Sequence, residues 1–308
     1  MHSVPLFDHI MVPEQVRRWG KGLIPEQVRK VIGQLDKKPV GRALAESFGL
    51  KVPRLYQMNI GLFDALALAN SHTDTEFVVK PVHGKNSWCV LLLRRTDHGV
   101  FFDVMAQRER SIEELCTETY KSYVKRRIGV ASNTVNLWMV EQLLIPSPES
   151  FVPIDDFKFY AFYGEVALIL HKRNFFVDGK WSSLYRWYDS SWNPIGTGKY
   201  DDKLGLEMRP PANSDSLMQA AVSTSLKLLA PFSRIDLYLS CGAVYFGEFT
   251  MLPGNPRGFD DETNSRLGLC WTSAEDRLIQ DVKGGAIPVE LYECYEKGLV
   301  DGWRNLRV

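Results

Sequence analysis

The residues best suited to chemistry are charged side chains in two β-prone runs late in the chain, joined by a glycine-containing turn. Arg234 and Asp236 alternate with apolar residues in the first run, so their side chains share one face of a strand. Glu248 lies in the second run. Two carboxylates beside an arginine, without a histidine cluster, are typical of a site for a hard cation such as Mg²⁺. The alternative is an ordinary arginine–carboxylate salt bridge on a solvent-facing hairpin.

The length of the turn between these runs decides whether the two carboxylates share a face. A two-residue turn at Cys241-Gly242 would place Asp236 and Glu248 on opposite faces of the hairpin. A three-residue turn, 240–242, puts its glycine at the left-handed third position that such loops favour. It also sets Arg234 opposite Glu248, with Asp236 diagonal to Glu248 at about 7–8 Å between backbones. We therefore predict the three-residue turn and a shared metal ion.

Three further charged residues lie at strand ends or on the polar face of a strand. Lys80 ends an apolar run directly before a polar loop, 83–85. A lysine there can reach phosphate oxygens while backbone N–H groups of the loop surround them. Lys158 lies on the polar face of a later hairpin, and Glu141 follows an apolar strand, where it could accept a hydrogen bond from an exocyclic amine. Each is also consistent with an ordinary strand-end or strand-face charge.

Hydrophobic periodicity and turn residues predict the elements that position these side chains. Strands are expected at 77–79, 88–93, 100–104, 137–144, 157–162, 166–170, 235–239 and 244–249. Helices are expected at 40–50, 111–128, 215–230 and 288–298. Strands and helices mixed with short antiparallel connections predict α+β lobes and argue against a doubly wound parallel sheet.

Bulk composition excludes several classes of protein. In 308 residues, 37 lysines and arginines balance 37 aspartates and glutamates, which argues against a nucleic-acid or anionic-membrane partner. Five scattered cysteines without C-x-x-C spacing predict neither a disulfide scaffold nor a structural zinc site. No stretch approaches the roughly 18 apolar residues of a membrane helix. We expect a cytoplasmic protein, and the sequence does not set its oligomeric state.

Taken in order, these segments resemble the ATP-grasp superfamily, and most closely the branch typified by the teichuronopeptide biosynthesis protein (TupA-like). The resembling stretch runs from about residue 36 to residue 261. The matching segments are 77–81, 83–85, 141–144, 156–160, 186–189 with Trp192, 234–238 and 247–250.

The resemblance implies an α+β ATP-grasp fold, with two lobes that grip ATP, 76–144 and 145–308, and a smaller N-terminal region, 1–75. By the same resemblance the chain binds ATP and Mg²⁺. The residues implied to contact the nucleotide are Lys80, His83, Gly84, Lys85, Glu141, Gln142, Leu143, Leu144 and Lys158. The loop 83–85 would act as a lid that excludes water.

The resemblance also assigns roles at the final hairpin. Asp236 and Glu248 would bind magnesium, and Arg234, with Lys158, would stabilise the transferred phosphoryl group. Many ATP-grasp enzymes carry asparagine two residues after the metal-binding glutamate, and that position here is Thr250. The third ligand of the second metal ion is therefore left open, with Thr250 and Asn255 as the candidates.

The implied activity is an ATP-dependent carboxylate–amine ligase. It would proceed through an acyl-phosphate, in natural-product or cell-surface polymer biosynthesis, with amino acids as the expected substrates. Arg173 and Arg186 can hold a carboxylate bidentately, and Tyr188 can contribute to an acceptor wall, although aromatic packing of a loop explains the same residues. The alternatives are an ATP-grasp-fold kinase that phosphorylates a hydroxyl and a nucleotide-binding protein without catalysis.

Overall fold

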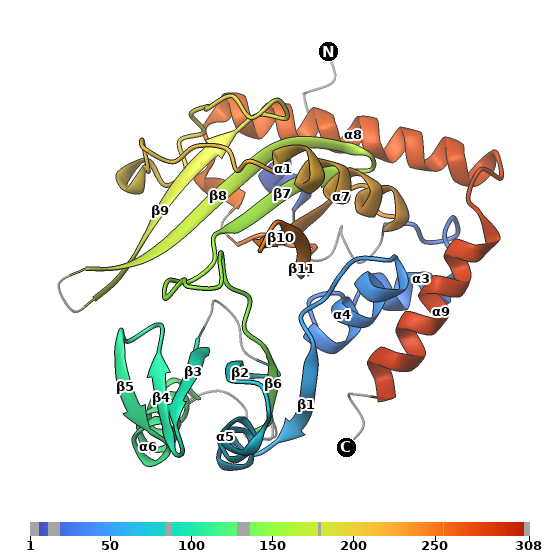
Figure 1. The fold of residues 1–308 in the computed structure, drawn as a ribbon. Coiled ribbons are helices and arrows are strands. Elements are labelled where there is room, and N and C mark those ends of the chain that lie inside the picture. Colours follow the sequence, from blue (N-terminus) through green and yellow to red (C-terminus); the bar gives the residue numbers. More distant parts are fainter. Residues whose placement is uncertain are drawn as a thin grey trace. The chain divides into compact units, whose positions relative to one another are not determined.

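The chain forms two compact units (Figure 1). A computed structural model describes residues 6–11, 19–83, 88–127, 136–177, 180–254 and 256–304. Unit 1 consists of Met1–Val52, Asp155–Arg173 and Ser183–Arg304, and unit 2 of Pro53–Ile154, Asn174–Ser182 and Asn305–Val308. The expected N-terminal region, 1–75, is thus divided between the two units.

Unit 2 contains a six-stranded antiparallel sheet in the order β1-β6-β2-β3-β4-β5. Its strands are β1 (Leu55–Ile60), β2 (Glu76–Pro81), β3 (Leu91–Asp97), β4 (Val100–Asp103), β5 (Arg108–Ser111) and β6 (Trp138–Gln142), and its helices are α5 (Leu62–Ser71) and α6 (Ile112–Arg127). Alternate β2 residues, Phe77 and Val79, are fully buried in one core with apolar residues of both helices. The intervening residues, Val78 and Lys80, therefore point to the other face of the sheet.

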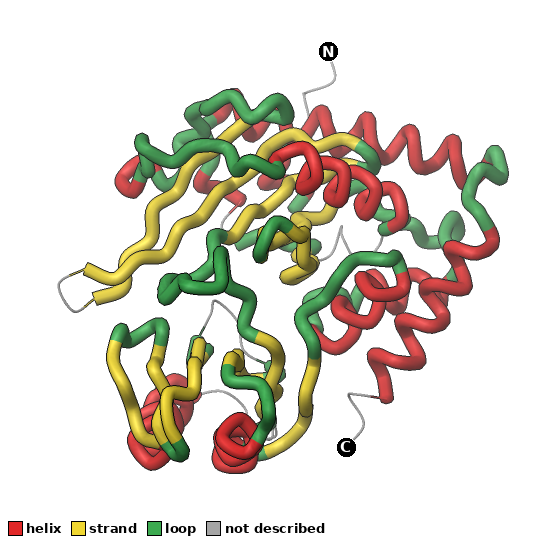
Figure 2. Tube along the Cα trace, viewed as in Figure 1, coloured by secondary structure: helices red, strands yellow, loops and turns green. Residues whose placement is uncertain are grey.

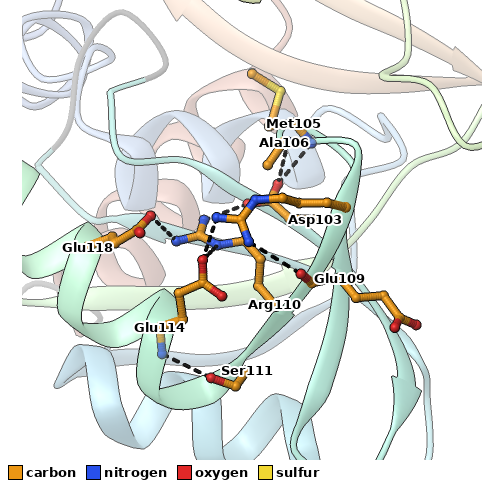
Figure 3. Close-up of polar contacts among 9 residues, drawn as sticks. Asp103, Met105, Ala106, Glu109, Arg110, Ser111, Glu114 and Glu118 are labelled. Carbon is orange, nitrogen blue, oxygen red and sulfur yellow. Dashed lines mark hydrogen bonds and ion pairs between the residues drawn. The ribbon is translucent and has the colours of Figure 1, made fainter. Parts of the chain in front are cut away.

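A buried arginine joins the edge of this sheet to α6 (Figure 3). The guanidinium of Arg110 donates to Asp103 Oδ2 at 2.8 Å and to Glu118 Oε2 at 2.7 Å. Both Arg110 and Asp103 are almost completely buried. Asp103 Oδ1 also accepts backbone N–H groups of Met105 and Ala106, at 2.9 and 3.1 Å. The carboxylate therefore fixes the β4–β5 turn and the arginine at once.

Replacing Arg110 with methionine is expected to lower the free energy of unfolding by about 3–5 kcal/mol, because Asp103 is left as a buried charge without its cation. Chemical denaturation followed by fluorescence measures the effect. The matched control is Arg108→Met, on the same strand: half of the Arg108 side chain is exposed, and its ion pair with Glu114 lies at the surface, so little change is expected. Equal effects of the two substitutions would contradict the assignment.

Unit 1 is built on a five-stranded antiparallel sheet in the order β11-β10-β7-β8-β9. The strands are β7 (Asp156–Phe162), β8 (Glu165–Val177), β9 (Lys180–Tyr188), β10 (Ser233–Ser240) and β11 (Ala243–Thr250). In β10, Ile235 and Leu237 are fully buried and alternate with Arg234 and Asp236. Because successive side chains in a strand point to opposite faces, one face of β10 forms core and the other carries charge.

Helices pack around this sheet (Figure 2). Helix α7 contacts β7, β10 and β11, α8 contacts β7 and α1, and α4 contacts both α9 and β11. The bounds are α1 (Phe7–Ile10), α3 (Glu26–Ile32), α4 (Lys38–Ser47), α7 (Ser214–Lys227), α8 (Asp261–Lys283) and α9 (Val289–Arg304), with short 3₁₀ turns η1 (Asp201–Lys203) and η2 (Pro256–Gly258). Two antiparallel sheets with packed helices confirm the predicted α+β class. Within the described residues, no helix is both long and apolar enough to span a bilayer.

Candidate active site

The β10–β11 hairpin closes with a two-residue turn. Ser240 pairs with Ala243, which leaves only Cys241 and Gly242 between the strands. Both have positive φ, 46° and 77°, as the type I′ turn requires. The predicted three-residue turn is therefore wrong, and Arg234 lies opposite Thr250 and not opposite Glu248.

A β-bulge further along the hairpin restores the shared face of the two carboxylates. Leu237 pairs with Phe246, but Asp236 pairs with Glu248, so Gly247 is an extra residue on β11. A bulge of this kind shifts the register by one residue. Asp236 and Glu248 are consequently direct cross-strand partners, whose side chains leave the same face. The expectation that both carboxylates lie on one face is confirmed, although the bulge produces it and the turn does not.

The bulge depends on glycine at position 247, because a Cβ atom there would lie 2.8 Å from the Tyr238 ring and 3.0 Å from the backbone oxygen of Asp236. Gly247→Ala is expected to cost about 1–3 kcal/mol of stability through overpacking. It should also weaken any ligand that needs the paired carboxylates. Thermal unfolding and calorimetry with MgATP measure both effects. Gly196→Ala is the control, since its Cβ would meet no atom within 4 Å. If Gly247→Ala had the same stability and the same affinity for MgATP as this control, the bulge would be dispensable.

A compact charge network surrounds Asp236. Arg234 donates from Nε to Oδ1 at 2.7 Å and from an Nη atom to Oδ2 at 2.8 Å. Lys158, the cross-strand neighbour on β7, donates to Asp236 Oδ2 at 2.5 Å and lies at the same distance from Asp156 Oδ2. Arg234 also donates to Glu248 Oε1 at 2.9 Å. Asp236 is only 1% exposed, whereas about half of the Glu248 side chain is exposed (53%).

The network sets the protonation of its members. Burial opposes ionisation of Asp236, but Arg234 and Lys158 hold the pKa of this carboxyl below its usual value. Burial likewise opposes the charge on Lys158, but Asp156 and Asp236 raise the pKa of its ammonium. Partial removal from water and the negative charge of Asp236 raise the pKa of Glu248. The surroundings of Glu248 therefore disfavour its ionised form, whereas those of Asp236 favour it.

The predicted nucleotide-contacting residues of unit 2 lie along β2 and β6. Lys80 and Glu141 form an ion pair with each other on the sheet face opposite the helical core. Gln142 accepts from the backbone N–H of Arg54 at 3.2 Å through Oε1. Of the other residues in this set, Leu143 and Leu144 are buried and His83 is exposed. The positions that fall outside the described residues are Gly84, Lys85 and the candidate metal ligand Asn255.

The predicted substrate residues lie on the other face of the unit 1 sheet. Phe157 pairs with His171, so Arg173, two residues further along β8, leaves the face opposite that of Lys158. Arg173 is held by Asp155, to which it donates at 2.6 and 3.0 Å.

The two predicted substrate residues on β9, Arg186 and Tyr188, also lie on the face opposite that of Lys158. Tyr188 donates to the Met208 carbonyl at 3.1 Å and packs on Trp192, which contacts Phe157. Arg186 shares the face of Tyr188 by strand alternation. The structure does not bring Arg173, Arg186 and Tyr188 to the Asp236 face.

The sequence matches a protein family model over residues 29–271, more than three quarters of the chain, and this model is described as TupA-like ATP-grasp. The chain belongs to the TupA-like ATP-grasp family. The resemblance inferred from the sequence is thereby confirmed. A comparison with curated proteins gives no match.

Solved structures that resemble this member of the TupA-like family include three ATP-grasp ligases. The ligase PsnB with its minimal precursor has a TM-score of 0.44 and 15% identity, covering 84% of this chain and 67% of PsnB. D-alanine–D-alanine ligase from Bacillus anthracis has a TM-score of 0.45 and 15% identity, covering 81% and 70%. VanG D-Ala:D-Ser ligase from Enterococcus faecalis has a TM-score of 0.44 and 13% identity, covering 83% and 63%. Family membership rests on the sequence match.

The ATP-grasp family name implies a nucleotide with its Mg²⁺, and the β10–β11 residues suit this ion. Asp236 accepts three hydrogen bonds, whereas a carboxylate has about four acceptor positions. Burial and the nearby charge of Asp236 raise the pKa of Glu248, and a cation beside this carboxyl group would favour its ionised form. Among the described residues, no group of three or more His, Cys, Asp or Glu side chains could hold a metal. Few protein ligands, completed by phosphate oxygens and water, are typical of Mg²⁺.

A buried lysine that feels the charge of Arg234 was not singled out from the sequence. Lys199 is buried, donates to the Gly254 carbonyl at 3.0 Å and lies 4.7 Å from the centre of the Phe259 ring. Burial, with a smaller contribution from the positive charge of Arg234, lowers the pKa of Lys199 to about 8. A lysine beside Gly198 in an irregular loop carries no periodic signal, so only the fold reveals its place.

Proposed function

We propose that this chain is an ATP-dependent ligase that joins a carboxylate to an amine and releases ADP and phosphate. The observation that carries the proposal is the cross-strand pair of Asp236 and Glu248 beside Arg234 and Lys158, in a chain of the TupA-like ATP-grasp family. ATP is the proposed co-substrate and Mg²⁺ the proposed metal ion. Amino acids are the foremost candidates for the joined substrates, in the synthesis of a natural product or a cell-surface polymer.

In this proposal the charged residues bind and orient the phosphates. Bound Mg²⁺ would neutralise charge on the phosphoryl oxygens, with Asp236 and Glu248 as its protein ligands and Thr250 or Asn255 as a further one. Arg234 holds both carboxylates in position. Its guanidinium would also stabilise the negative charge of the transferred phosphoryl group.

The other predicted nucleotide contacts follow the family resemblance. Lys158 and Lys80 would bind phosphate oxygens, and Glu141 would accept from the adenine amine. Because Lys80 and Glu141 are paired with each other, nucleotide binding would exchange this ion pair for contacts with the ligand. The free energy gained from contacts with the ligand must therefore exceed the free energy lost when that ion pair is broken.

The proposed reaction has two steps. A carboxylate oxygen of the acid substrate bonds to the γ-phosphorus of ATP as the bond to the oxygen of ADP breaks. The nitrogen of the amine then bonds to the acyl carbon, phosphate leaves with the electron pair of the carbon–oxygen bond, and the nitrogen loses a proton. Little covalent chemistry falls to the protein, whose contribution is positioning and charge stabilisation.

Hydroxylamine trapping tests the proposal. Purified protein is incubated with MgATP, hydroxylamine and a panel of amino acids, and both hydroxamate and phosphate are measured. A ligase gives a hydroxamate with its acid substrate, whereas a kinase gives a phosphorylated hydroxyl and no hydroxamate. Calorimetry with MgATP in the absence of acid is the second arm. Failure to bind adenine nucleotide would overturn the proposal, and nucleotide binding without turnover across the panel would favour a non-catalytic role.

A further inference from the structure

A second lysine lies on the Asp236 face of the sheet, one position beyond the network described above. Lys172 on β8 is the cross-strand partner of Asp156 on β7. Asp156 precedes Lys158 by two residues, and Lys158 pairs with Asp236 on β10. Cross-strand partners and residues two apart share a face, so Lys172 points to the side of the sheet that carries Asp236. Along β8, Lys172 lies two residues, roughly 6.6 Å, from Leu170, which is the cross-strand partner of Lys158.

The carboxylate opposite Lys172 is already engaged. Asp156 Oδ2 contacts the Lys158 ammonium at 2.5 Å, and Asp156 Oδ1 is buried without a hydrogen-bond partner in the part of the chain that the structure describes. Within the same residues, the Lys172 ammonium makes no side-chain hydrogen bond or ion pair. The other charges that face it are Asp236 and Arg234, both on β10.

The surroundings of Lys172 disfavour an unpaired charge. Its side chain is half-buried. Burial lowers the pKa of its ammonium, and the cations Lys158 and Arg234 act in the same direction, against Asp156 and Asp236. Removing a cation from water without a partner costs free energy, which an anionic oxygen of a ligand would offset.

We infer that Lys172 is a further anion-binding residue of this site, which contacts a carboxylate or phosphate oxygen of the bound ligand. The inference rests on the proposed function in so far as it takes the Asp236 face as the ligand-binding face. The neighbours of Lys172 in sequence show why the strand register matters. His171 and Arg173 leave the opposite face, where both contact Asp155. The structure therefore selects the middle one of three consecutive basic residues.

Protection from amine labelling tests the inference without relying on turnover. Intact protein is acetylated with an N-hydroxysuccinimide ester, and the labelling rate at Lys172 is followed by mass spectrometry against exposed Lys203. The ligand conditions are no addition, inorganic phosphate, an ATP analogue that resists hydrolysis with Mg²⁺, and that analogue with mixed amino acids. A ligand at ten times its Kd should slow labelling of Lys172 about tenfold and leave Lys203 unchanged.

The conditions distinguish the two sources of the anion. Protection by phosphate or by the nucleotide alone assigns Lys172 to a phosphate group, and protection only after amino acids are added assigns it to a substrate carboxylate. Either result supports the inference. Labelling that no ligand changes overturns it.

Variants provide the second test. Lys172→Met should weaken the protecting ligand about tenfold in calorimetry, a loss of about 1.4 kcal/mol, while Lys172→Arg retains most of the affinity. Lys203→Met is the matched control. Unchanged affinity with a lowered melting temperature would instead mean that Lys172 only supports Asp156, and would overturn the inference.

The outcomes separate this inference from the proposed function. Hydroxamate formation by a protein whose Lys172 no ligand protects would leave the ligase proposal standing and remove the inference. Protection of Lys172 without hydroxamate formation would support the inference and count against the ligase proposal.

Discussion

The Glu248→Gln variant is expected to lose at least about 100-fold in kcat for ADP release, because the amide removes the charge that would hold the metal against the phosphates. Its fold should remain intact, with stability within about 0.5 kcal/mol of the wild-type protein or slightly above it. The pKa of Glu248 is raised in the folded protein, so its carboxyl group stabilises the fold only while protonated. Glutamine mimics that protonated form.

The effect of Glu248→Gln on stability depends on pH. Stability associated with Glu248 is fully present below its unfolded pKa, about 4.3, and is lost as the pH rises through the higher folded value. Any stability advantage of Glu248→Gln should therefore appear at neutral pH and vanish near pH 4. Melting temperatures across this range measure the effect, in parallel with a coupled assay for ADP.

Glu165→Gln is the matched control for this variant. Glu165 belongs to the same sheet, is equally exposed (53%) and lies 3.6 Å from Arg277, so the substitution removes a comparable surface carboxylate. Activity should be unchanged. Normal turnover by Glu248→Gln, or an equal loss in both variants, would contradict the metal-binding role.

The final hairpin shows how far the sequence could predict the site. Alternation in 234–239 correctly placed Arg234 and Asp236 on a polar face. The predicted turn length was wrong because a two-residue turn combined with a bulge places Asp236 and Glu248 on the same face, as a three-residue turn alone would. Gly247 inside a β-prone run was the available signal, since a glycine within a strand often marks a bulge.

Two large elements, β9 and α8, were not among the predicted ones. The aromatic residues of β9 alternate between two covered faces: Trp187 contacts Tyr160, and Tyr188 contacts Trp192. A strand covered on both sides shows no polar alternation.

Helix α8 was predictable by contrast. Its buried residues Leu267, Trp271 and Leu278 follow helical spacing, and the Asp260 side chain caps its start by accepting the Thr263 N–H at 2.8 Å.

The sequence could not show which of three neighbouring basic residues faces the site. His171, Lys172 and Arg173 are consecutive, and which of them faces Asp236 depends on the register of β7 with β8. If the register shifted by one residue, Arg173 would lie on that face in place of Lys172. Register in turn depends on core packing at Phe157 and Phe159, which local spacing does not specify.

Replacing Lys158 with methionine is expected to abolish nucleotide-dependent turnover and to lower the free energy of unfolding by about 3–5 kcal/mol. Its ammonium is the common partner of Asp156 and Asp236, at 2.5 Å from each. The variant therefore leaves both carboxylates without the cation they share, although Arg234 still donates to Asp236 and Lys172 still lies opposite Asp156. Chemical denaturation and calorimetry with MgATP measure the two effects.

The pH dependence of this loss follows from the pKa of Asp236. That pKa is lowered in the wild-type fold, so the associated stability is present above the unfolded value, about 3.9, and is lost as the pH falls through the folded one. Lys158→Met raises the folded pKa towards or above the unfolded value. The stability gap between the two proteins should thus be widest near neutral pH and narrow at low pH. A gap that does not change with pH would contradict the electrostatic explanation.

A double variant separates the structural role of Lys158 from its proposed role in binding phosphate. Asp156→Asn, added to Lys158→Met, removes one of the two unpaired carboxylates and leaves Asp236 with its bidentate partner Arg234. Part of the lost stability should return, with a coupling of about 0.5–3 kcal/mol between the two positions. Turnover and nucleotide affinity should not return, because no cation replaces the ammonium. If the double variant recovered both stability and turnover, Lys158 would act only as a support for the two aspartates.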